Sequence, residues 1–148
     1  MLKLLFVLSL FTINAFAQDK QYVDLGAKTI HIENSKLLSV QLRNTKKWHT
    51  YWKNPGDAGL EIKFKFFIDG EKIELNDYPW PAPKRYIEQG NMWAYGYSGD
   101  YAMFFDIKDN LKDKTLKIVG EWLVCKDICI PGKRTIKMKI NMQLQVAY

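Results

Sequence analysis

Apolar residues recur at every second position along much of this chain, whereas the period of a helix hardly appears. Side chains on a strand point alternately to opposite faces, so this spacing predicts half-buried β-strands. One such strand is "LEIKFKF", residues 60–66, whose core-facing positions are Leu60, Ile62, Phe64 and Phe66. A longer one covers residues 136–146, with a core face of Ile136, Met138, Ile140, Met142, Leu144 and Val146.

Turn chemistry separates these strands from the remaining candidates. Asp69-Gly70, between "FKFFI" and "EKIEL", is a strong signal for a two-residue hairpin. "NPGDAG", "SGD" and "IPGK" predict further turns. The other predicted strands are residues 28–33, 37–43, 48–53, 101–107 and 115–125. Seven or eight short strands in one domain predict an all-β fold, an immunoglobulin-like antiparallel β-sandwich. A small closed barrel is the alternative.

One stretch, residues 77–100, does not alternate. Prolines at positions 79, 81 and 83 exclude a central strand and favour extended chain. We predict a long connection here, and connections of this length inside a compact domain are usually functional or disordered. The aromatic residues make an ordered segment the expectation: Trp80, Trp93, Tyr95 and Tyr97.

The N-terminus has the pattern of a secretory signal. Lys3 precedes an apolar run from Leu4 to Ile13, and Ala15-Phe16-Ala17 supplies the small residues that a signal peptidase reads. We expect residues 1–17 to be a cleaved signal peptide and residues 18–148 to be one exported β-sandwich domain. The run is about half the length of a membrane span, and we expect no transmembrane segment in the mature chain.

The charge pattern bears on possible partners. The formal net charge is +6, but the lysines are dispersed along strand-like stretches rather than gathered in one block. Nucleic-acid binding needs a basic stripe interleaved with exposed aromatic residues, and we find no such stripe. We therefore predict no nucleic-acid partner.

Both cysteines lie in "VCKDICIPG", residues 124–132, with three residues between Cys125 and Cys129. A chain reversal over this length can bring two Cα atoms within about 6 Å, so a disulfide is possible. A loop this short offers only about 2 kcal/mol of chain entropy, which is weak for a structural bridge. An accessible short-loop disulfide can instead exchange with other thiols. The spacing alone leaves a redox couple and an inert bridge equally open.

Other chemistries have weaker support. Neither His31 nor His49 lies at ligand spacing from the cysteines, so we predict no metal site and no cofactor, although two thiolates could hold Cu(I). The sequence distinguishes no pair of acidic residues and no serine triad that would indicate a hydrolase. "WHTYW" and "WPAPKR" could form an aromatic platform for carbohydrate, but aromatic residues of this kind usually fill a core.

Four blocks in order carry a resemblance to a known family: "WHTYWKNPGDAGL", "WPAPKRYIEQG", "YGYSGD" and "WLVCKDICIPG". They resemble the N-terminal periplasmic domain of the DsbD/ScsB thiol:disulfide interchange proteins. The resemblance runs from about Trp48 to Gly132 and implies an immunoglobulin-like fold, a periplasmic location and a redox-active cysteine pair. Three residues between the cysteines is the spacing of the ScsB-like branch, whereas the enterobacterial DsbD domain has five.

The resemblance also implies roles for particular residues. Cys129 matches the cysteine that forms the mixed disulfide with a partner, and Cys125 matches the one that resolves it. The family covers its disulfide with an aromatic cap, and the matching stretch "NMWAYGY" makes Trp93 or Tyr95 the expected cap residue. Tyr51 and Trp52 are expected beside the sulfur atoms.

The partners that the resemblance implies are thioredoxin-fold periplasmic proteins and a membrane electron donor. Because the chain ends at Tyr148, we expect the donor to be a separate polypeptide. The protein would be a redox carrier more than a turnover enzyme. The competing hypothesis is a secreted binding or structural module whose disulfide is inert.

Overall fold

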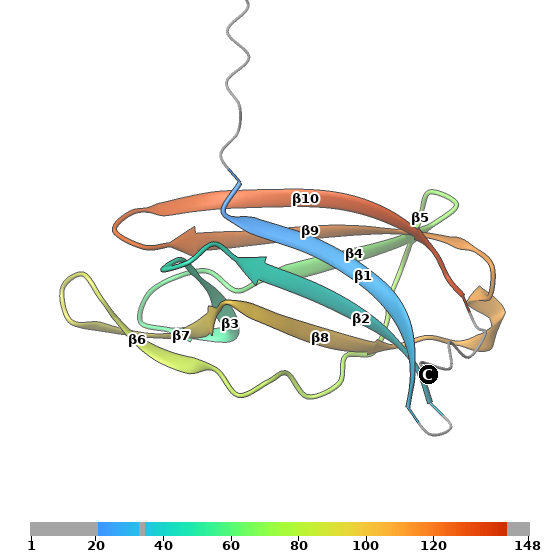
Figure 1. The fold of residues 1–148 in the computed structure, drawn as a ribbon, viewed down its shortest axis with the longest axis horizontal. Helices are drawn as coiled ribbons and strands as arrows, with labels where there is room; N and C mark the ends of the chain where they lie inside the picture. The colour runs from blue at the N-terminus through green and yellow to red at the C-terminus, as the bar shows by residue number, and fades with distance from the viewer. Residues whose placement is uncertain (1–20, 33–34, 142–148) are drawn as a thin grey trace, which may run out of the picture.

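The computed structural model describes residues 21–32 and 35–141, which form ten strands and one 3-10 turn. The long strands lie beside one another and run roughly along the length of an elongated body (Figure 1). In chain order the elements are β1 (Val23–Ile32), β2 (Ser35–Asn44), β3 (His49–Gly56), β4 (Lys63–Ile68), β5 (Glu71–Ile73), β6 (Lys84–Glu88), β7 (Met92–Ser98), β8 (Asp100–Asp106), η1 (Asp109–Leu111), β9 (Thr115–Cys125) and β10 (Cys129–Lys139).

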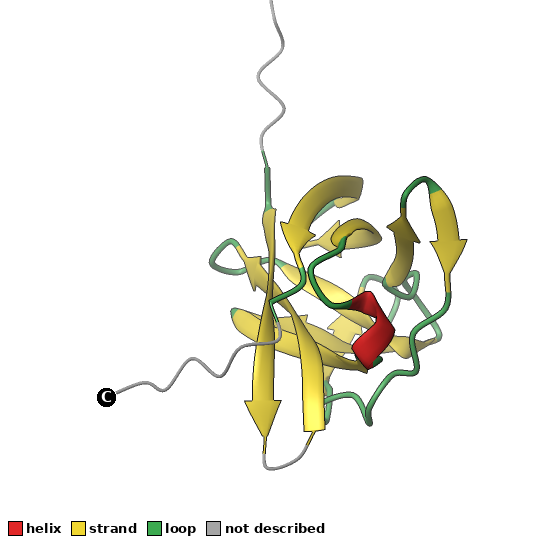
Figure 2. Ribbon diagram, turned by 90° about the vertical axis from the view of Figure 1, so that its right-hand side faces the viewer, coloured by secondary structure: helices red, strands yellow, loops and turns green. Residues whose placement is uncertain are grey.

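The strands form two antiparallel sheets. The smaller has the order β1-β2-β8, and the larger has the order β5-β4-β9-β3-β7-β6, with β10 on the other edge of β9. β3 and β4 pair with successive parts of β9, and the chain between them leaves the sheet. Figure 2 shows the sheets from the end of the molecule, with the short helical turn facing the viewer. The fold is the immunoglobulin-like antiparallel β-sandwich that the alternation predicted.

Several local predictions are confirmed. Residues 115–125 are one strand, and β4 and β5 are joined by the two-residue turn Asp69-Gly70, with Ile68 paired to Glu71. Both turn residues have positive φ, which is what a tight hairpin of this kind requires and why glycine is favoured there. The proline-rich residues 78–83 lie outside the strands, as expected.

Other predictions were wrong. Residues 77–100 are not one long connection, because β6 and β7 form a hairpin within them. Ala94 and Gly96 occupy a buried face of β7, so this face lacks the large apolar residues by which alternation usually indicates a strand. Leu60 is 64% exposed and precedes β4, so only the later residues of "LEIKFKF" reach the core. The last strand begins at Cys129 rather than Ile136.

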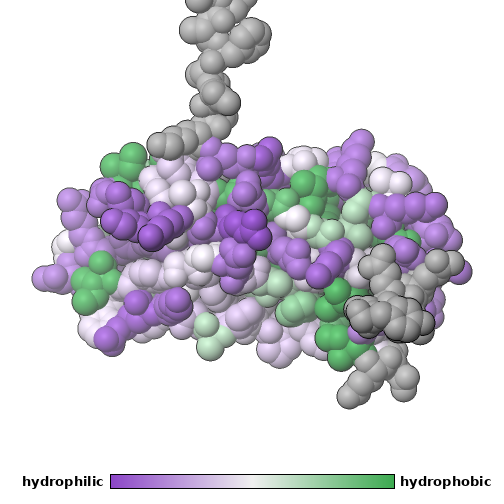
Figure 3. All heavy atoms as spheres, viewed as in Figure 1, coloured by the Kyte–Doolittle hydropathy of each residue, from purple (hydrophilic) through white to green (hydrophobic). Residues whose placement is uncertain are grey.

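Some predictions concern residues outside the described ranges. The predicted signal peptide at residues 1–17 is one of these, as are the core positions Met142, Leu144 and Val146. Within the described part, no helix is long and apolar enough to cross a membrane. Hydrophilic residues are spread over the face shown in Figure 3, which agrees with the dispersed charge of the sequence.

Two apolar clusters fill the interior, and their separation positions the site. The main core lies between the sheets and includes Leu38, Val40, Met103, Leu116 and Ile118, which are completely buried. A second, smaller cluster consists of Tyr51, Ala94 and Cys125. Neighbouring residues of β3 point to opposite faces, so Tyr51 joins the small cluster while Trp52 packs against the main core.

Candidate functional site at the tip of the β9–β10 hairpin

Cys125 and Cys129 form a disulfide where β9 turns into β10. They are directly opposed in the register of the two strands, and their Cα atoms are 4.1 Å apart. The reversal is made by residues 126–128, where the Lys126 amide donates to the Ile128 carbonyl over 3.1 Å. The disulfide therefore closes the tip of a hairpin.

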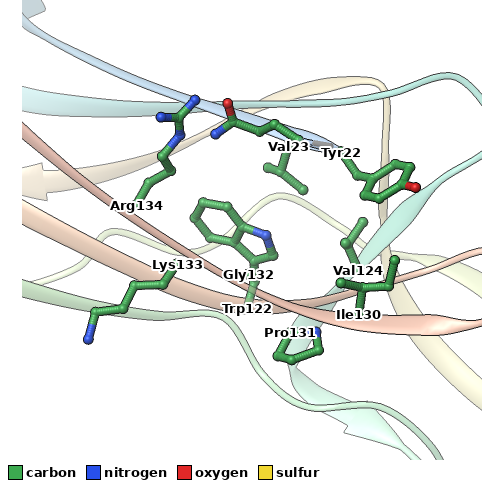
Figure 4. A pocket seen from close by; sticks show the side chains of 10 residues that line it. Tyr22, Val23, Trp122, Val124, Ile130, Pro131, Gly132, Lys133 and Arg134 are labelled. Carbon is green, nitrogen blue, oxygen red and sulfur yellow. The ribbon is translucent and has the colours of Figure 1, made fainter. Parts of the chain in front are cut away.

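Pro131 and Gly132 do not form the turn that the sequence indicated, because both lie inside β10. Gly132 is needed there because the Trp122 indole lies against it: an added Cβ would be 2.2 Å from the indole nitrogen. Figure 4 shows this indole in a hollow between the start of β1 and β10. The lining of that hollow includes neither cysteine, so it is separate from the disulfide site.

The two sulfur-bearing residues differ sharply in exposure. Cys125 is 0% exposed and lies in the sheet between His49 of β3 and Cys129 of β10. Cys129 belongs to the exposed residues. An external thiol can therefore approach the disulfide from the Cys129 side, while Cys125 is shielded by the protein.

Tyr51 brings a polar group to the exposed sulfur. Its hydroxyl lies 3.9 Å from Cys129 Sγ, and its ring is packed so tightly on Gly59 that an added Cβ there would be 2.3 Å from it. The hydroxyl donates to Glu88 Oε1 over 3.0 Å. Burial, followed by the negative charge of Glu88 and this hydrogen bond, raises the pKa of Tyr51 well above its usual value. Tyr51 is thus a neutral phenol at physiological pH.

Glu88 also contacts a second residue of β3. Glu88 Oε1 lies 2.7 Å from His49 Nε2. Only 14% of the Glu88 side chain and 9% of the His49 side chain are exposed. The His49 ring stacks on the Tyr86 ring, with centroids 4.2 Å apart. A largely buried polar network, His49–Glu88–Tyr51, therefore joins β3 to β6 and reaches the disulfide.

An open concavity lies beside Cys129. Its volume is about 650 Å³, and its walls come from the β6–β7 hairpin on one side and the disulfide loop on the other. Three apolar residues on these walls are prominently exposed: Ile87 at 67%, Met92 at 41% and Ile128 at 64%. Exposed apolar side chains that gather on one surface are typical of a protein contact site.

The structure places the predicted site residues differently. It brings Tyr51 to Cys129 but directs Trp52 to the main core. Trp93 is 44% exposed, with the Arg85 guanidinium 4.2 Å from its ring centroid, and Tyr95 packs near Gly56. From the predicted cap hairpin, the residues that line the concavity are Ile87, Glu88, Gln89 and Met92. The cap role of Trp93 or Tyr95 stays a prediction.

Comparison with known proteins assigns the chain. The family described as "Thiol:disulfide interchange protein DsbD, N-terminal" matches residues 16–140. The chain belongs to this DsbD N-terminal family. The family match agrees with the position of the cysteine pair, which is the feature that a thiol-disulfide interchange domain requires.

Solved structures of DsbD-type domains share the fold. The N-terminal periplasmic domain of ScsB from Proteus mirabilis superposes with a TM-score of 0.67 at 18% identity, covering 83% of this chain and 48% of that one. The reduced DsbD N-terminal domain of Neisseria meningitidis gives 0.52 at 12% identity, covering 79% and 86%. The chain thus spans about half the length of the ScsB structure. A search of curated proteins gave no match.

Within the described residues, no group of three or more histidine, cysteine or acidic side chains could hold a metal ion. His49 contacts the Glu88 carboxylate. The sequence did not predict that Glu88 belongs to the site. Nothing local distinguishes it among the 16 acidic residues of the chain, and its partners on β3 are 37 and 39 positions away.

Proposed function

We propose that this protein is an exported electron carrier that exchanges its Cys125–Cys129 disulfide with thioredoxin-fold proteins. The observation that carries the proposal is the unequal exposure of the two cysteines in a hairpin-tip disulfide. Exchange needs one sulfur atom that a partner can reach and a second sulfur atom, in the same protein, that attacks the mixed disulfide and releases the partner. Cys129 suits the first role and Cys125 the second.

The reduced protein would transfer two electrons in two steps. The Cys129 thiolate attacks a sulfur of the partner's disulfide, forming a mixed disulfide and releasing the partner's other sulfur as a thiolate. The Cys125 thiolate then attacks Cys129 Sγ. This closes the internal disulfide and releases the partner fully reduced. Regeneration is the reverse exchange with a reduced donor, which we propose is a membrane protein.

The β6–β7 hairpin would act as the cover of this disulfide. It carries Trp93 and Tyr95, one of which we propose as the cap residue, while Tyr51 is proposed to lie beside the sulfur atoms throughout the reaction. Because Cys129 is exposed, this hairpin would narrow the approach to the sulfur atom without closing it. The exposed apolar residues around the concavity supply a surface on which a partner's apolar residues would be buried.

The proposed compartment is the periplasm. The signal-like residues 1–17 support export, and the two similar structures are an N-terminal periplasmic domain of ScsB and a DsbD N-terminal domain. In that oxidising setting the cysteine pair would be a disulfide whenever no donor reduces it.

Trapping of the mixed disulfide tests the proposal. A thioredoxin with one active-site cysteine, activated as its mixed disulfide with thionitrobenzoate, is added to the reduced Cys125→Ser variant. The Cys129 thiolate should displace thionitrobenzoate, which is followed by its absorbance, and leave a covalent complex visible on a non-reducing gel. Cys129→Ser is the matched control and should react at least about 100-fold more slowly, because its remaining thiol is buried. Equal yields from the two variants would contradict the assigned roles.

One observation favours the competing function, a binding or structural module with an inert bridge. Cys125 belongs to the buried cluster with Tyr51 and Ala94, so the disulfide also ties the hairpin tip to the interior. An inert bridge resists reduction by the glutathione pool, whereas a carrier's disulfide does not. The reduction potential therefore separates the two functions.

A further inference from the structure

The β6–β7 hairpin forms one wall of the concavity, yet its position in the sheet gives it little support. β6 lies at the edge of the larger sheet and is paired with β7. Beyond Glu88 the chain reverses through Gln89, Gly90 and Asn91, and Met92 closes the hairpin opposite Glu88. Edge hairpins open locally at low free energy unless side chains tie them down.

Glu88 supplies such a tie. A single carboxylate oxygen contacts both the Tyr51 hydroxyl at 3.0 Å and His49 Nε2 at 2.7 Å, so it links β6 directly to β3 across the intervening strand. The small side chain of Ala94 on β7, opposite Tyr86, leaves room for the Tyr86 ring to reach over and stack on His49. Because the network is largely buried, breaking it would leave polar groups without partners, which is costly.

Glu88 therefore connects the β6–β7 wall of the concavity, through Tyr51, to the sulfur atom of Cys129. Ile87 and Met92, which flank the hairpin tip, line the same concavity as the disulfide loop, and the Glu88 carboxylate accepts the hydrogen bond of the Tyr51 hydroxyl beside Cys129. Cys129 is already exposed, so a small thiol needs no movement of the wall. A protein partner must fit the concavity, and a preformed surface binds with less ordering cost than a mobile one.

We propose that Glu88 is a positioning residue that fixes the β6–β7 hairpin as a preformed wall for the protein partner of Cys129. It acts through His49 and Tyr51 and does not itself touch the reacting sulfur. This inference rests on the proposed function for its kinetic consequence. The anchoring of the hairpin can be measured without any partner.

The test uses Glu88→Leu and Glu88→Gln in the Cys125→Ser background. Glu88→Leu should speed amide hydrogen exchange of β6 and β7 by at least about 10-fold and leave β1, β2 and β8 unchanged, because two hydrogen bonds are lost locally. It should slow the reaction with thionitrobenzoate-activated thioredoxin by at least about 10-fold, while the reaction with the small disulfide dithiobis(nitrobenzoate) changes by less than about twofold. Glutamine keeps an acceptor oxygen, so Glu88→Gln should retain most of the amide protection of β6 and β7 and most of the rate with thioredoxin.

Glu71→Leu is the matched control, since Glu71 is an exposed carboxylate that opens β5 at the opposite edge of the sheet. It should leave both reactions and the β6–β7 amides unchanged. Unchanged β6–β7 amide exchange in Glu88→Leu would overturn the proposal, and so would an unchanged or faster reaction with thioredoxin. If the Cys125→Ser protein itself fails to react with thioredoxin, the proposed function is wrong, and amide exchange alone decides whether Glu88 anchors the hairpin.

Discussion

Iodoacetamide should alkylate Cys129 of the reduced protein at least about 100-fold faster than Cys125, because a buried thiol reacts only when the structure opens around it. Cys125 is 0% exposed and is held between two neighbouring strands, whereas Cys129 is exposed at the mouth of the concavity. The rates are best measured on the single-cysteine variants Cys129→Ser and Cys125→Ser by mass spectrometry. The same variants in denaturant are the control, and there the rates should converge.

The direction of this asymmetry matters for the mechanism. If Cys125 reacted as quickly as Cys129 in the folded protein, neither sulfur would be selected for attack, and the two steps assigned above would have no structural basis. A faster Cys125 would reverse the roles of attacking and resolving cysteine. The predicted ordering depends on burial and does not require knowledge of either thiol pKa.

Gly96→Ala should destabilise the folded protein by about 3 kcal/mol, because a Cβ added at this position has no room. An ideal Cβ on Gly96 would lie 1.9 Å from the Thr50 carbonyl oxygen and 3.0 Å from the Tyr51 Cα. Both contacts are with backbone, so relief requires β3 and β7 to move apart. The free energy of unfolding in urea measures the effect, and the variant should also loosen Tyr51 beside the disulfide.

Gly26→Ala is the control for this substitution. Gly26 lies in β1, and a Cβ added there meets nothing within 4 Å. The same chemical change should therefore alter the free energy of unfolding by less than about 0.5 kcal/mol. A loss below about 1 kcal/mol for Gly96→Ala would contradict the close approach of β3 and β7.

The fold was largely predictable from local pattern. The period-two alternation at residues 115–125 and the Asp69-Gly70 turn indicated strands and a hairpin that the structure confirms. Prediction failed where local pattern and tertiary environment disagree. β7 has the small residues Ala94 and Gly96 on a buried face, where the Thr50 carbonyl leaves no room for a Cβ at Gly96, so that face lacks the large apolar residues that usually mark a strand.

The candidate site was predictable in part. The cysteine pair was evident from spacing and resemblance, and Tyr51 does lie beside Cys129. The network around it was not, because His49, Tyr51 and Glu88 meet only after β6, β7 and β3 assemble side by side. Contacts between residues this far apart in the chain depend on strand order, which alternation does not specify.

The reduction potential of the Cys125–Cys129 pair tests the central claim most directly. It is obtained by equilibrating the protein with glutathione or dithiothreitol buffers and trapping the free thiols. An electron carrier should have a potential between about −150 and −270 mV, the range of proteins that exchange disulfides. A potential well below about −300 mV would identify a permanent structural bridge and contradict the proposed function.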